Sequence, residues 1–374
     1  MTRVQLLAAA LVAFTSLGSA VAQGAGSTEE CRERTMIEEH SAVKDERFDS
    51  QFTRFGPGWT GGDSTYSTVL PDGRTVWFFS DSFVGFVNPS RTRPRNSPMI
   101  HNSLVVQDGE ELTTLTGDIG GIPQSFFTER DADSWYWVYD ATVEATTAGD
   151  VVRVFLIRFQ RTSAGGIWGF EWLDNALATL SLPDLELVSI EPLPSDHGVS
   201  WGAAVLEQDE YVYIYGTEDL GAFKHMHVAR APAGSVADPG RWEYATGPGG
   251  GDWSSDPADS VRLLTGIGNE YSVTEVEGGF LLITMSSETR LSPEIVAYVA
   301  CDPAGPFTDR TVVYLTPENE EDMVFTYNAH AHPQFTEDGA LLVSYNVNAA
   351  DVAWVFADAD LYRPRFVRVR IGEL

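Results

Sequence analysis

The chain has 374 residues and a formal net charge of −30, from 24 basic and 54 acidic side chains. This excess of negative charge argues against nucleic acid or any other polyanion as a partner, because phosphate groups would be repelled. Ten Trp and 13 Tyr residues accompany the acids, and flat aromatic surfaces beside carboxylates are typical of carbohydrate sites.

The first 22 residues have the pattern of an export signal. A short basic head at 1–3 precedes an apolar run at 4–17, and the small-x-small sequence at 20–22 is typical of a cleavage site. The apolar run is too short to span a bilayer comfortably, and no later segment reaches about 20 apolar residues. We therefore expect residues 1–22 to be removed and the mature protein to be secreted, extracellular and free of the membrane, rather than held by an uncleaved anchor.

Residues 23–44 are interpreted as an N-terminal arm and residues 45–374 as one folded domain. The two cysteines, Cys31 and Cys301, lie on the arm and the body. A disulfide between them would tie the arm down in an oxidising compartment. Two free thiols fit the sequence equally well.

A hairpin of two strands rich in aromatic and β-branched residues recurs along the mature chain at fairly even intervals, and helical patterns are nearly absent. Five similar units, each with room for two more strands, predict an all-β, five-bladed β-propeller. A pair of β-sandwiches is the competing fold, but it does not explain a fivefold repeat. The predicted hairpins are Thr65–Phe79, Ala141–Phe155, Gly202–Tyr215, Tyr271–Thr284 and His330–Tyr345.

Outer strands follow several of these hairpins. The strand Phe366–Ile371 alternates regularly and is expected to close the ring. The other outer strands are expected at His101–Gln107, His225–Ala231, Arg241–Ala245, Glu294–Ala300 and Thr311–Leu315.

Residues that flank the hairpin strands of a propeller share one rim of the central channel. Acids occupy these positions in three consecutive units, and aromatic, amide and imidazole groups occupy them in the others, which predicts a polar cup for a polysaccharide. The rim residues are Asp63, Asp81, Asp140, Trp201, Glu218, Tyr271, Ser272, Asn328, His330, Asn346 and Asn348.

The first hairpin can be analysed more closely. A three-residue loop at 71–73 would pair Leu70 with Arg74. Counting outward then places Asp63 opposite Asp81, with Cβ atoms roughly 4.5–5.5 Å apart. A two-residue loop would shift the register by one and separate the two side chains.

Two carboxylates this close cannot both ionise cheaply, so one pKa should rise. Cleavage of a glycosidic bond needs one protonated and one ionised carboxyl group, because one group protonates the leaving oxygen and the other activates water or attacks carbon. No cofactor or metal is expected. The structural alternative makes Asp63 a turn residue and Asp81 a strand-end cap.

The histidines give a weaker signal. His330 and His332 alternate along one strand, but two ligands without a third do not define a metal site. A hydrogen bond to a sugar or a carboxylate is the favoured role. His101 and Asn102 begin an outer strand, where a substrate contact is expected.

The segments GGDSTYSTVLPDGRTVWFFSDSFVG, HNSLVVQ, YNAHAHPQF and LLVSYNVN resemble the secreted bacterial propellers of domain of unknown function 4185. Part of that group forms glycoside hydrolase family 183, the endo-D-arabinanases, and the likeness runs from about Gly58 to Leu374. It implies anomer-inverting hydrolysis of D-arabinofuranosyl linkages by two aspartates, which match Asp63 and Asp81 by motif. Asp63 is assigned as the base and Asp81 as the acid, since desolvation behind the aromatic residues 77–79 would raise the pKa of Asp81.

Other assignments remain open. The segments WYWVYDATVE and WGAAVLEQDEYVYIYGTEDLGAFKHMHVARAP also loosely resemble arabinanase and invertase propellers, which implies Asp140 as a pKa tuner and Glu218 as the acid. A sugar-binding propeller without catalysis and an interaction platform are alternatives from other classes. The chain is expected to be monomeric, and the sugar, the linkage, endo or exo action and the stereochemical outcome stay undetermined.

Overall fold

The structure is a computed structural model that describes residues 36–128, 133–163, 169–321 and 323–372. The predicted export signal and Cys31 lie outside the described residues. Cys301 is not a free thiol. Within the described ranges, no helix has the length and apolarity needed to cross a membrane.

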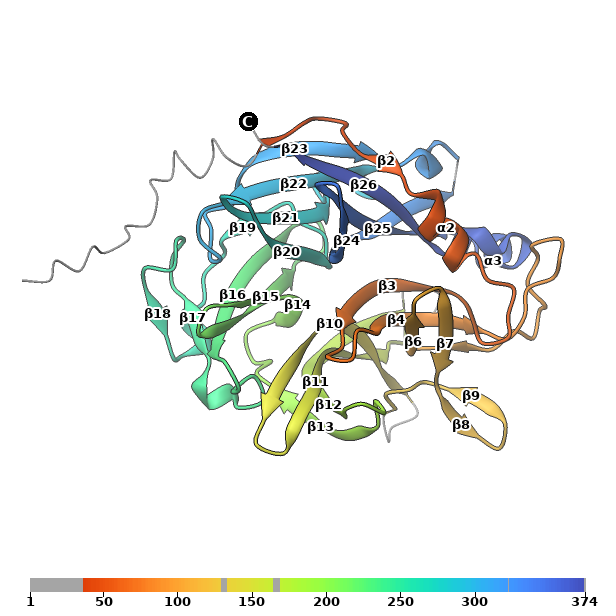
Figure 1. Cartoon of the computed structure of the whole chain (residues 1–374), viewed down its shortest axis with the longest axis horizontal. Helices are drawn as coiled ribbons and strands as arrows, with labels where there is room; N and C mark the ends of the chain where they lie inside the picture. Colours follow the sequence, from red (N-terminus) through yellow and green to blue (C-terminus); the bar gives the residue numbers. More distant parts are fainter. Residues whose placement is uncertain (1–35, 129–132, 164–168, 322, 373–374) are drawn as a thin grey trace, which may run out of the picture.

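Five antiparallel sheets are arranged around a common axis, as Figure 1 shows, and the predicted five-bladed propeller is confirmed. Blade 1 consists of β3 (Trp59–Val69), β4 (Thr75–Val84), β6 (Ser103–Asp108) and β7 (Glu111–Leu115), with β5 (Met99–Ile100) beside β4. Blade 2 consists of β10 (Ser134–Thr146), β11 (Gly149–Arg161), β12 (Phe170–Ser181) and β13 (Leu187–Leu193). Blade 3 consists of β14 (Val199–Gln208), β15 (Tyr211–Asp219), β16 (Lys224–Pro232), β17 (Glu243–Ala245) and β18 (Trp253–Ser254), with β19 (Leu264–Thr265) beside β16.

Blade 4 consists of β20 (Tyr271–Val276), β21 (Gly279–Met285), β22 (Glu294–Ala300) and β23 (Thr308–Leu315). Blade 5 consists of β24 (Val324–Glu337), β25 (Ala340–Ala349) and β26 (Pro364–Gly372), joined by β1 (Met36–Ile37) and β2 (Val43–Lys44). The remaining elements are the hairpin β8 (Gly117–Ile119) and β9 (Ile122–Gln124), helices α2 (Glu46–Phe52) and α3 (Val352–Ala357), and 3-10 turns at Pro239–Arg241, Pro257–Asp259, Pro317–Glu320 and Ala359–Tyr362.

The two ends of the described chain meet in blade 5. β26 pairs with β25 on one side and with β1 and β2 on the other, so the strand predicted to close the ring does so together with the predicted N-terminal arm. The backbone N–H groups of His40 and Ala42 also donate to the carbonyl groups of Val312 and Val313 in β23. The segment 36–44 therefore joins blade 5 to blade 4.

Helix α2 seals the junction between blades 5 and 1. Asp45 caps the helix by accepting a hydrogen bond from the Phe48 N–H group at 3.0 Å. Phe48 and Phe52 are buried on one face of the helix. They pack against an aromatic cluster whose other members are Trp59, Trp77, Phe79 and Phe366. Each fully buried Phe side chain contributes about 1.5–3 kcal/mol relative to exposure.

The predicted loop of the first hairpin is confirmed. Leu70 N–H donates to the Arg74 carbonyl group at 2.8 Å, and Gly73 has φ +89°. The expected register holds from there to the pair Tyr66↔Phe78. It then shifts at Ser64 and Thr65, whose φ values of +67° and +71° form a β-bulge.

Four of the five innermost strands carry such a register shift near their middle. The shift in β10 falls between Val138 and Ala141, in β14 between Trp201 and Ala204, and in β24 between Tyr327 and His330. Strand β20 pairs regularly with β21. Bulges redirect the side chains that follow them, so alternation counted from the hairpin turns does not hold through β10, β14 and β24. In β3 the expected register returns beyond the bulge, at the pairs Gly62↔Ser82 and Gly61↔Phe83.

The start of β3 packs closely against the C-terminal part of the chain. The carbonyl group of Thr60 accepts hydrogen bonds from the guanidinium groups of Arg93 at 3.1 Å and Arg363 at 3.0 Å. A Cβ atom at Gly61 would overlap the carbonyl oxygen of Tyr362. Only glycine allows this contact, and it brings the Tyr362 side chain to the start of blade 1.

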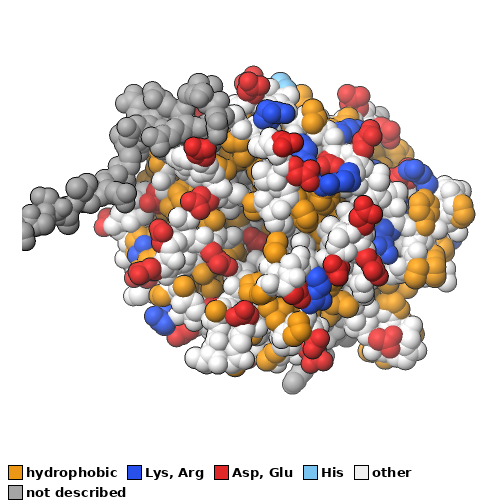
Figure 2. Space-filling model, viewed as in Figure 1, with side chains coloured by type: hydrophobic (Ala, Val, Ile, Leu, Met, Phe, Trp, Pro, Cys, Tyr) orange, Lys and Arg blue, Asp and Glu red, His pale blue; other side chains and the backbone are white. Residues whose placement is uncertain are grey.

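The negative charge is not concentrated at one place on the face of the molecule that Figure 2 shows. Figure 2 shows acidic side chains scattered across the visible face of the molecule instead of in a single patch. Surface charge alone therefore does not mark a site.

We expect Gly61→Ala to lower the free energy of unfolding by about 1–3 kcal/mol, the usual cost of overpacking a filled position. Urea denaturation monitored by tryptophan fluorescence measures the change. Gly247→Ala is the matched control, because no atom lies within 4 Å of its Cβ position, and its effect should stay within about 0.5 kcal/mol. Equal effects of the two substitutions would contradict the close approach at Gly61.

Candidate active site

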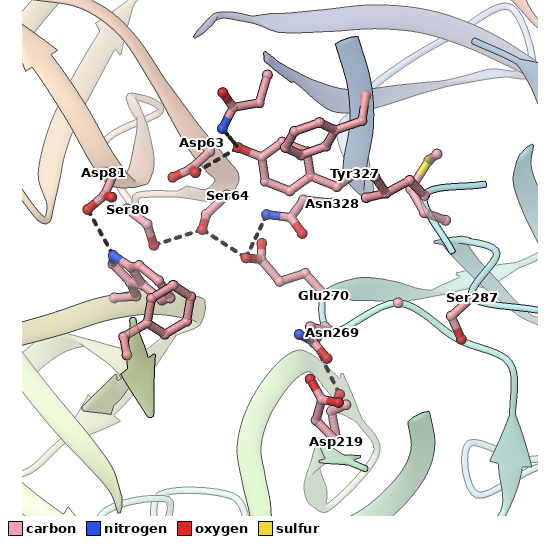
Figure 3. Close-up of a pocket in the computed structure, with 18 of the residues that line it drawn as sticks. Asp63, Ser64, Ser80, Asp81, Asp219, Asn269, Glu270, Ser287, Tyr327 and Asn328 are labelled. Atoms are coloured by element: carbon pink, nitrogen blue, oxygen red, sulfur yellow. Dashed lines mark hydrogen bonds between the residues drawn. The ribbon is translucent and has the colours of Figure 1, made fainter. Parts of the chain in front are cut away.

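A pocket of about 1100 Å³ opens at the end of the channel where the innermost strands begin. All five blades contribute to its lining, and three carboxylates lie together at its centre (Figure 3). They are Asp63 on β3, Asp81 on β4 and Glu270, which directly precedes β20. The pocket thus brings together the two aspartates that the sequence predicts as catalytic.

Two tyrosines hold Asp63. Tyr327 lies on β24 of blade 5, and Tyr362 lies in the segment that precedes β26. Its Oδ2 atom accepts hydrogen bonds from the hydroxyl groups of Tyr327 at 2.8 Å and Tyr362 at 2.9 Å. Its Oδ1 atom is buried and has no hydrogen-bond partner among the described residues. The carboxyl group is therefore fixed through one oxygen, and the other oxygen, which has no hydrogen-bond partner in the described part of the protein, can carry a proton.

Burial raises the pKa of Asp63 well above its ordinary value, and the nearby charge of Asp81 raises it further. The hydrogen bond from Tyr327 opposes this shift, and the charge of Glu270 adds to it. From the sequence, the raised pKa was expected at Asp81 because of the aromatic residues before it. The structure gives this property to Asp63.

Asp81 is anchored from the opposite side. Its Oδ1 atom lies 2.8 Å from His101 Nδ1 and 2.9 Å from Trp137 Nε1, both of which can donate to a carboxylate. The His101 ring stacks on Trp135 with a centroid distance of 4.7 Å and an interplanar angle of 18°. His101 thus lines the pocket, as expected from sequence, and it orients a catalytic candidate.

Glu270 was missed from the sequence. Its Oε1 atom accepts hydrogen bonds from Ser64 Oγ at 3.0 Å and Asn328 Nδ2 at 2.8 Å. Its Oε2 atom lies 3.0 Å from His330 Nε2. The sequence pattern does point near this residue, because the rim position assigned to the fourth unit is Tyr271, which directly follows Glu270. Asn328 lines the pocket as predicted. His330 does not line it, which corrects its predicted role in substrate binding, because it is 1% exposed and lies behind Glu270.

Tyr271 and Trp201 do not line the pocket, which corrects their predicted role in substrate binding. The Tyr271 hydroxyl donates to the Gly216 carbonyl group at 2.9 Å inside the core. Trp201 is 3% exposed and packs against Tyr244. Ser272 also points away from the carboxylates, since its Oγ atom accepts the N–H group of Ala331.

Asp140 and Glu218 also lie elsewhere, so the arabinanase-like arrangement of these two acids is corrected. The bulge in β10 turns Asp140 toward the other end of the channel, where its carboxylate accepts the N–H groups of Ala141 and Val205. Burial raises the pKa of Asp140 to about 6. Glu218 forms a bidentate ion pair with Arg262 at 2.5 and 2.9 Å, and this pairing lowers its pKa.

His332, Asn346 and Asn102 do not line the pocket, which corrects their predicted role in substrate binding. His332 lies 2.6 Å from Ser67 Oγ and 2.8 Å from Ser344 Oγ, and burial lowers its pKa well below the ordinary value. Asn346 donates to Thr65 Oγ1 at 2.8 Å and so supports the bulge in β3. Asn102 is fully buried and bonds to backbone groups of Phe127 and Tyr136.

The side chains of the pocket define its chemistry. Among the described residues, no group of three or more His, Cys, Asp or Glu side chains is arranged to hold a metal ion. Neighbouring carboxyl groups can act as a general acid and a general base.

Solved structures show the same architecture. A suspected hydrolase from Bacteroides ovatus is 24% identical, with a TM-score of 0.74 over 91% of this chain and 94% of that chain. A GH43 enzyme from Xanthomonas citri, solved in complex with xylose, is 13% identical, with a TM-score of 0.50 over 93% of this chain and 96% of that chain. The protein is thus a propeller of the fold that glycoside hydrolases of family 43 also adopt.

The model of one protein family, Domain of unknown function (DUF5005), matches residues 45–371, and the chain belongs to this family. Among the curated proteins, none matches the sequence. The resemblance to domain of unknown function 4185 and to glycoside hydrolase family 183 stays a prediction.

The raised pKa of Asp63 has a consequence for stability. Ionising this group above its ordinary pKa of 3.8 costs the folded state free energy that a neutral side chain avoids. We therefore expect Asp63→Asn to raise the thermal unfolding midpoint at neutral pH. The difference from the wild type should shrink as the pH falls toward 3.8 and vanish below it, where aspartate is neutral in both the folded and the unfolded state.

Thermal scans by circular dichroism over this pH range test the expectation. Asp196→Asn serves as the control, because Asp196 is an exposed aspartate outside the pocket. A loss of stability in Asp63→Asn that grows toward neutral pH would contradict the assigned direction of the pKa shift.

Proposed function

We propose that the protein is a secreted glycoside hydrolase that cleaves a furanose-rich polysaccharide, with D-arabinan as the favoured substrate. The observation that carries this proposal is the pair Asp63 and Asp81 at the centre of a large axial pocket. One carboxyl group is buried with a raised pKa, and the other accepts two hydrogen bonds from fixed donors. Glycosidic hydrolysis requires such an unequal pair.

In the proposed reaction Asp63 is the general acid and Asp81 the general base. Asp81 removes a proton from a water molecule while the water oxygen forms a bond to the anomeric carbon. The bond from that carbon to the leaving oxygen breaks, and Asp63 donates its proton to this oxygen. The scheme follows the inverting route, which the likeness to family 183 favours, and it reverses the roles that sequence alone suggested.

Glu270 supports the acid in this scheme. Its charge raises the pKa of Asp63, and its own oxygens are held by Ser64, Asn328 and His330. A fixed anion next to the acid keeps that acid protonated at a higher pH. We assign Glu270 as a positioning and tuning residue.

The choice of D-arabinan rests on the resemblance of the first-blade motif to that of the endo-D-arabinanases, which implies that Asp63 and Asp81 match their two aspartates. Action outside the cell follows from the predicted export signal, and a monomer suffices because one chain supplies all three carboxylates. The fold shared with GH43 glycosidases supports hydrolysis in general.

We expect purified protein to release oligosaccharides from arabinogalactan that contains D-arabinan, and not from plant L-arabinan. Asp63→Asn and Asp81→Asn should each lower the rate by about 10²–10⁴-fold, the usual contribution of general acid–base catalysis. Chromatography of the products measures the rate, and Asp196→Asn is the control. Binding of D-arabinan by the wild type without any turnover would favour the non-catalytic sugar-binding alternative.

The two roles can be separated by the pH dependence of kcat/KM. The Tyr362 hydroxyl lowers the pKa of Asp63, so Tyr362→Phe should raise that pKa. If Asp63 is the acid, the alkaline limb of the profile moves to higher pH, because the proton is retained longer. A shift of the acidic limb to higher pH would instead identify Asp63 as the base.

A further inference from the structure

Blade 2 presents a row of aromatic side chains to the pocket. We call this row the aromatic wall, and all of its members line the pocket that contains the carboxylates. The aromatic wall consists of Trp135, Trp137, Phe159, Phe170 and Trp172.

The wall extends from the innermost strand outward. Trp135 and Trp137 are two residues apart on β10 and so point to the same face. Trp135 pairs with Phe159 on β11, and Phe159 pairs with Trp172 on β12. Phe170 joins them, with its ring centroid 4.9 Å from that of Trp137. The row therefore crosses three strands and leads away from the channel axis.

The inner end of the wall touches the catalytic pair. Trp137 donates its indole N–H group to Asp81, and Trp135 carries the stacked ring of His101. A ligand whose scissile bond lies at Asp81 would continue directly onto these rings.

The wall is less covered than the aromatic core of the same protein. Trp59 and Trp77 in blade 1 are 0% exposed, whereas Trp137, Phe159 and Trp172 are only half-buried. Rings left uncovered inside a pocket are a usual feature of ligand sites, because a ligand supplies the missing contact. The apolar C–H faces of sugar rings fit such flat surfaces.

The size and charge of the pocket narrow the ligand class. The pocket volume of about 1100 Å³ is larger than the range of about 300–1,000 Å³ that is typical of pockets for drug-sized ligands. The carboxylates of Asp81 and Glu270 at the inner end disfavour an acidic sugar next to the scissile bond, whereas the basic residues that line the pocket are Arg161, Lys224 and Arg290.

We propose that the aromatic wall is a binding groove for several consecutive units of a neutral glycan on one side of the scissile bond. This inference rests on the proposed hydrolase function for the position of that bond. It makes the protein selective for chains over single sugars, and it assigns Trp137 and Trp172 as specificity-determining residues.

The test measures binding separately from turnover. Asp63→Asn is titrated by calorimetry with arabino-oligosaccharides from the disaccharide to the hexasaccharide, and the affinity should rise with chain length. Adding Trp172→Ala should weaken hexasaccharide binding by about tenfold, equivalent to about 1.4 kcal/mol, and leave disaccharide binding unchanged. Trp253→Ala is the matched control, since Trp253 is a half-buried tryptophan on β18 outside the pocket.

The outcomes distinguish the groove from the hydrolase. Equal affinity for short and long chains, or no effect of Trp172→Ala and Trp137→Ala in variants with unchanged circular dichroism, would overturn the groove and leave hydrolysis by the wild type untouched. Length-dependent binding that Trp172→Ala abolishes, without turnover by the wild type, would support the groove and refute the hydrolase. In an active enzyme, Trp172→Ala should raise KM for long chains and leave kcat nearly unchanged.

Discussion

The β-bulges in the innermost strands are the constraint on which the site depends. In β3 the bulge places two consecutive residues, Ser64 and Thr65, in the left-handed region of backbone conformation, which is costly for side chains other than glycine. Hydrogen bonds from Ser64 to Glu270 and from Asn346 to Thr65 stabilise this conformation. In return, the bulge turns Asp63 toward two tyrosines and Ser64 toward blade 4, so blades 1, 4 and 5 meet at one point.

The closure of the propeller ring also brings residues to Asp63. Tyr362 reaches Asp63 from 299 positions further along the chain, because the segment before β26 lies directly on Gly61. The arginines that hold Thr60 come from residues 93 and 363. The junction between the first and last blades is thus both the place where the propeller closes and the wall of the candidate active site.

Ionisation of Asp63 costs free energy in the same region of the protein. A buried carboxyl group beside other carboxylates disfavours its own ionisation, and the folded protein tolerates this because the neighbouring segments are fixed by hydrogen bonds and packing. Such strained, charged pockets are where proteins commonly give up stability for function. The aromatic wall follows the same principle, because several of its rings are only half-buried.

The sequence by itself determined the parts of the structure that are local. Turn residues and alternation define a hairpin within some 15 residues, which is why the five blades and the loop at Gly73 were predictable. Asp63 and Asp81 share one hairpin, so their proximity follows from the order of the residues alone, whereas the bulge between them does not.

Only the tertiary structure decided which other residues join them. A bulge directs Asp140 to the opposite end of the channel, and Arg262, which lies in a loop, forms an ion pair with Glu218. Glu270 and Tyr362 join the two aspartates through contacts between different parts of the ring. Pairing rules within a hairpin carry no information about such contacts, because they are set by how blades pack around the axis and by where the two ends of the chain meet.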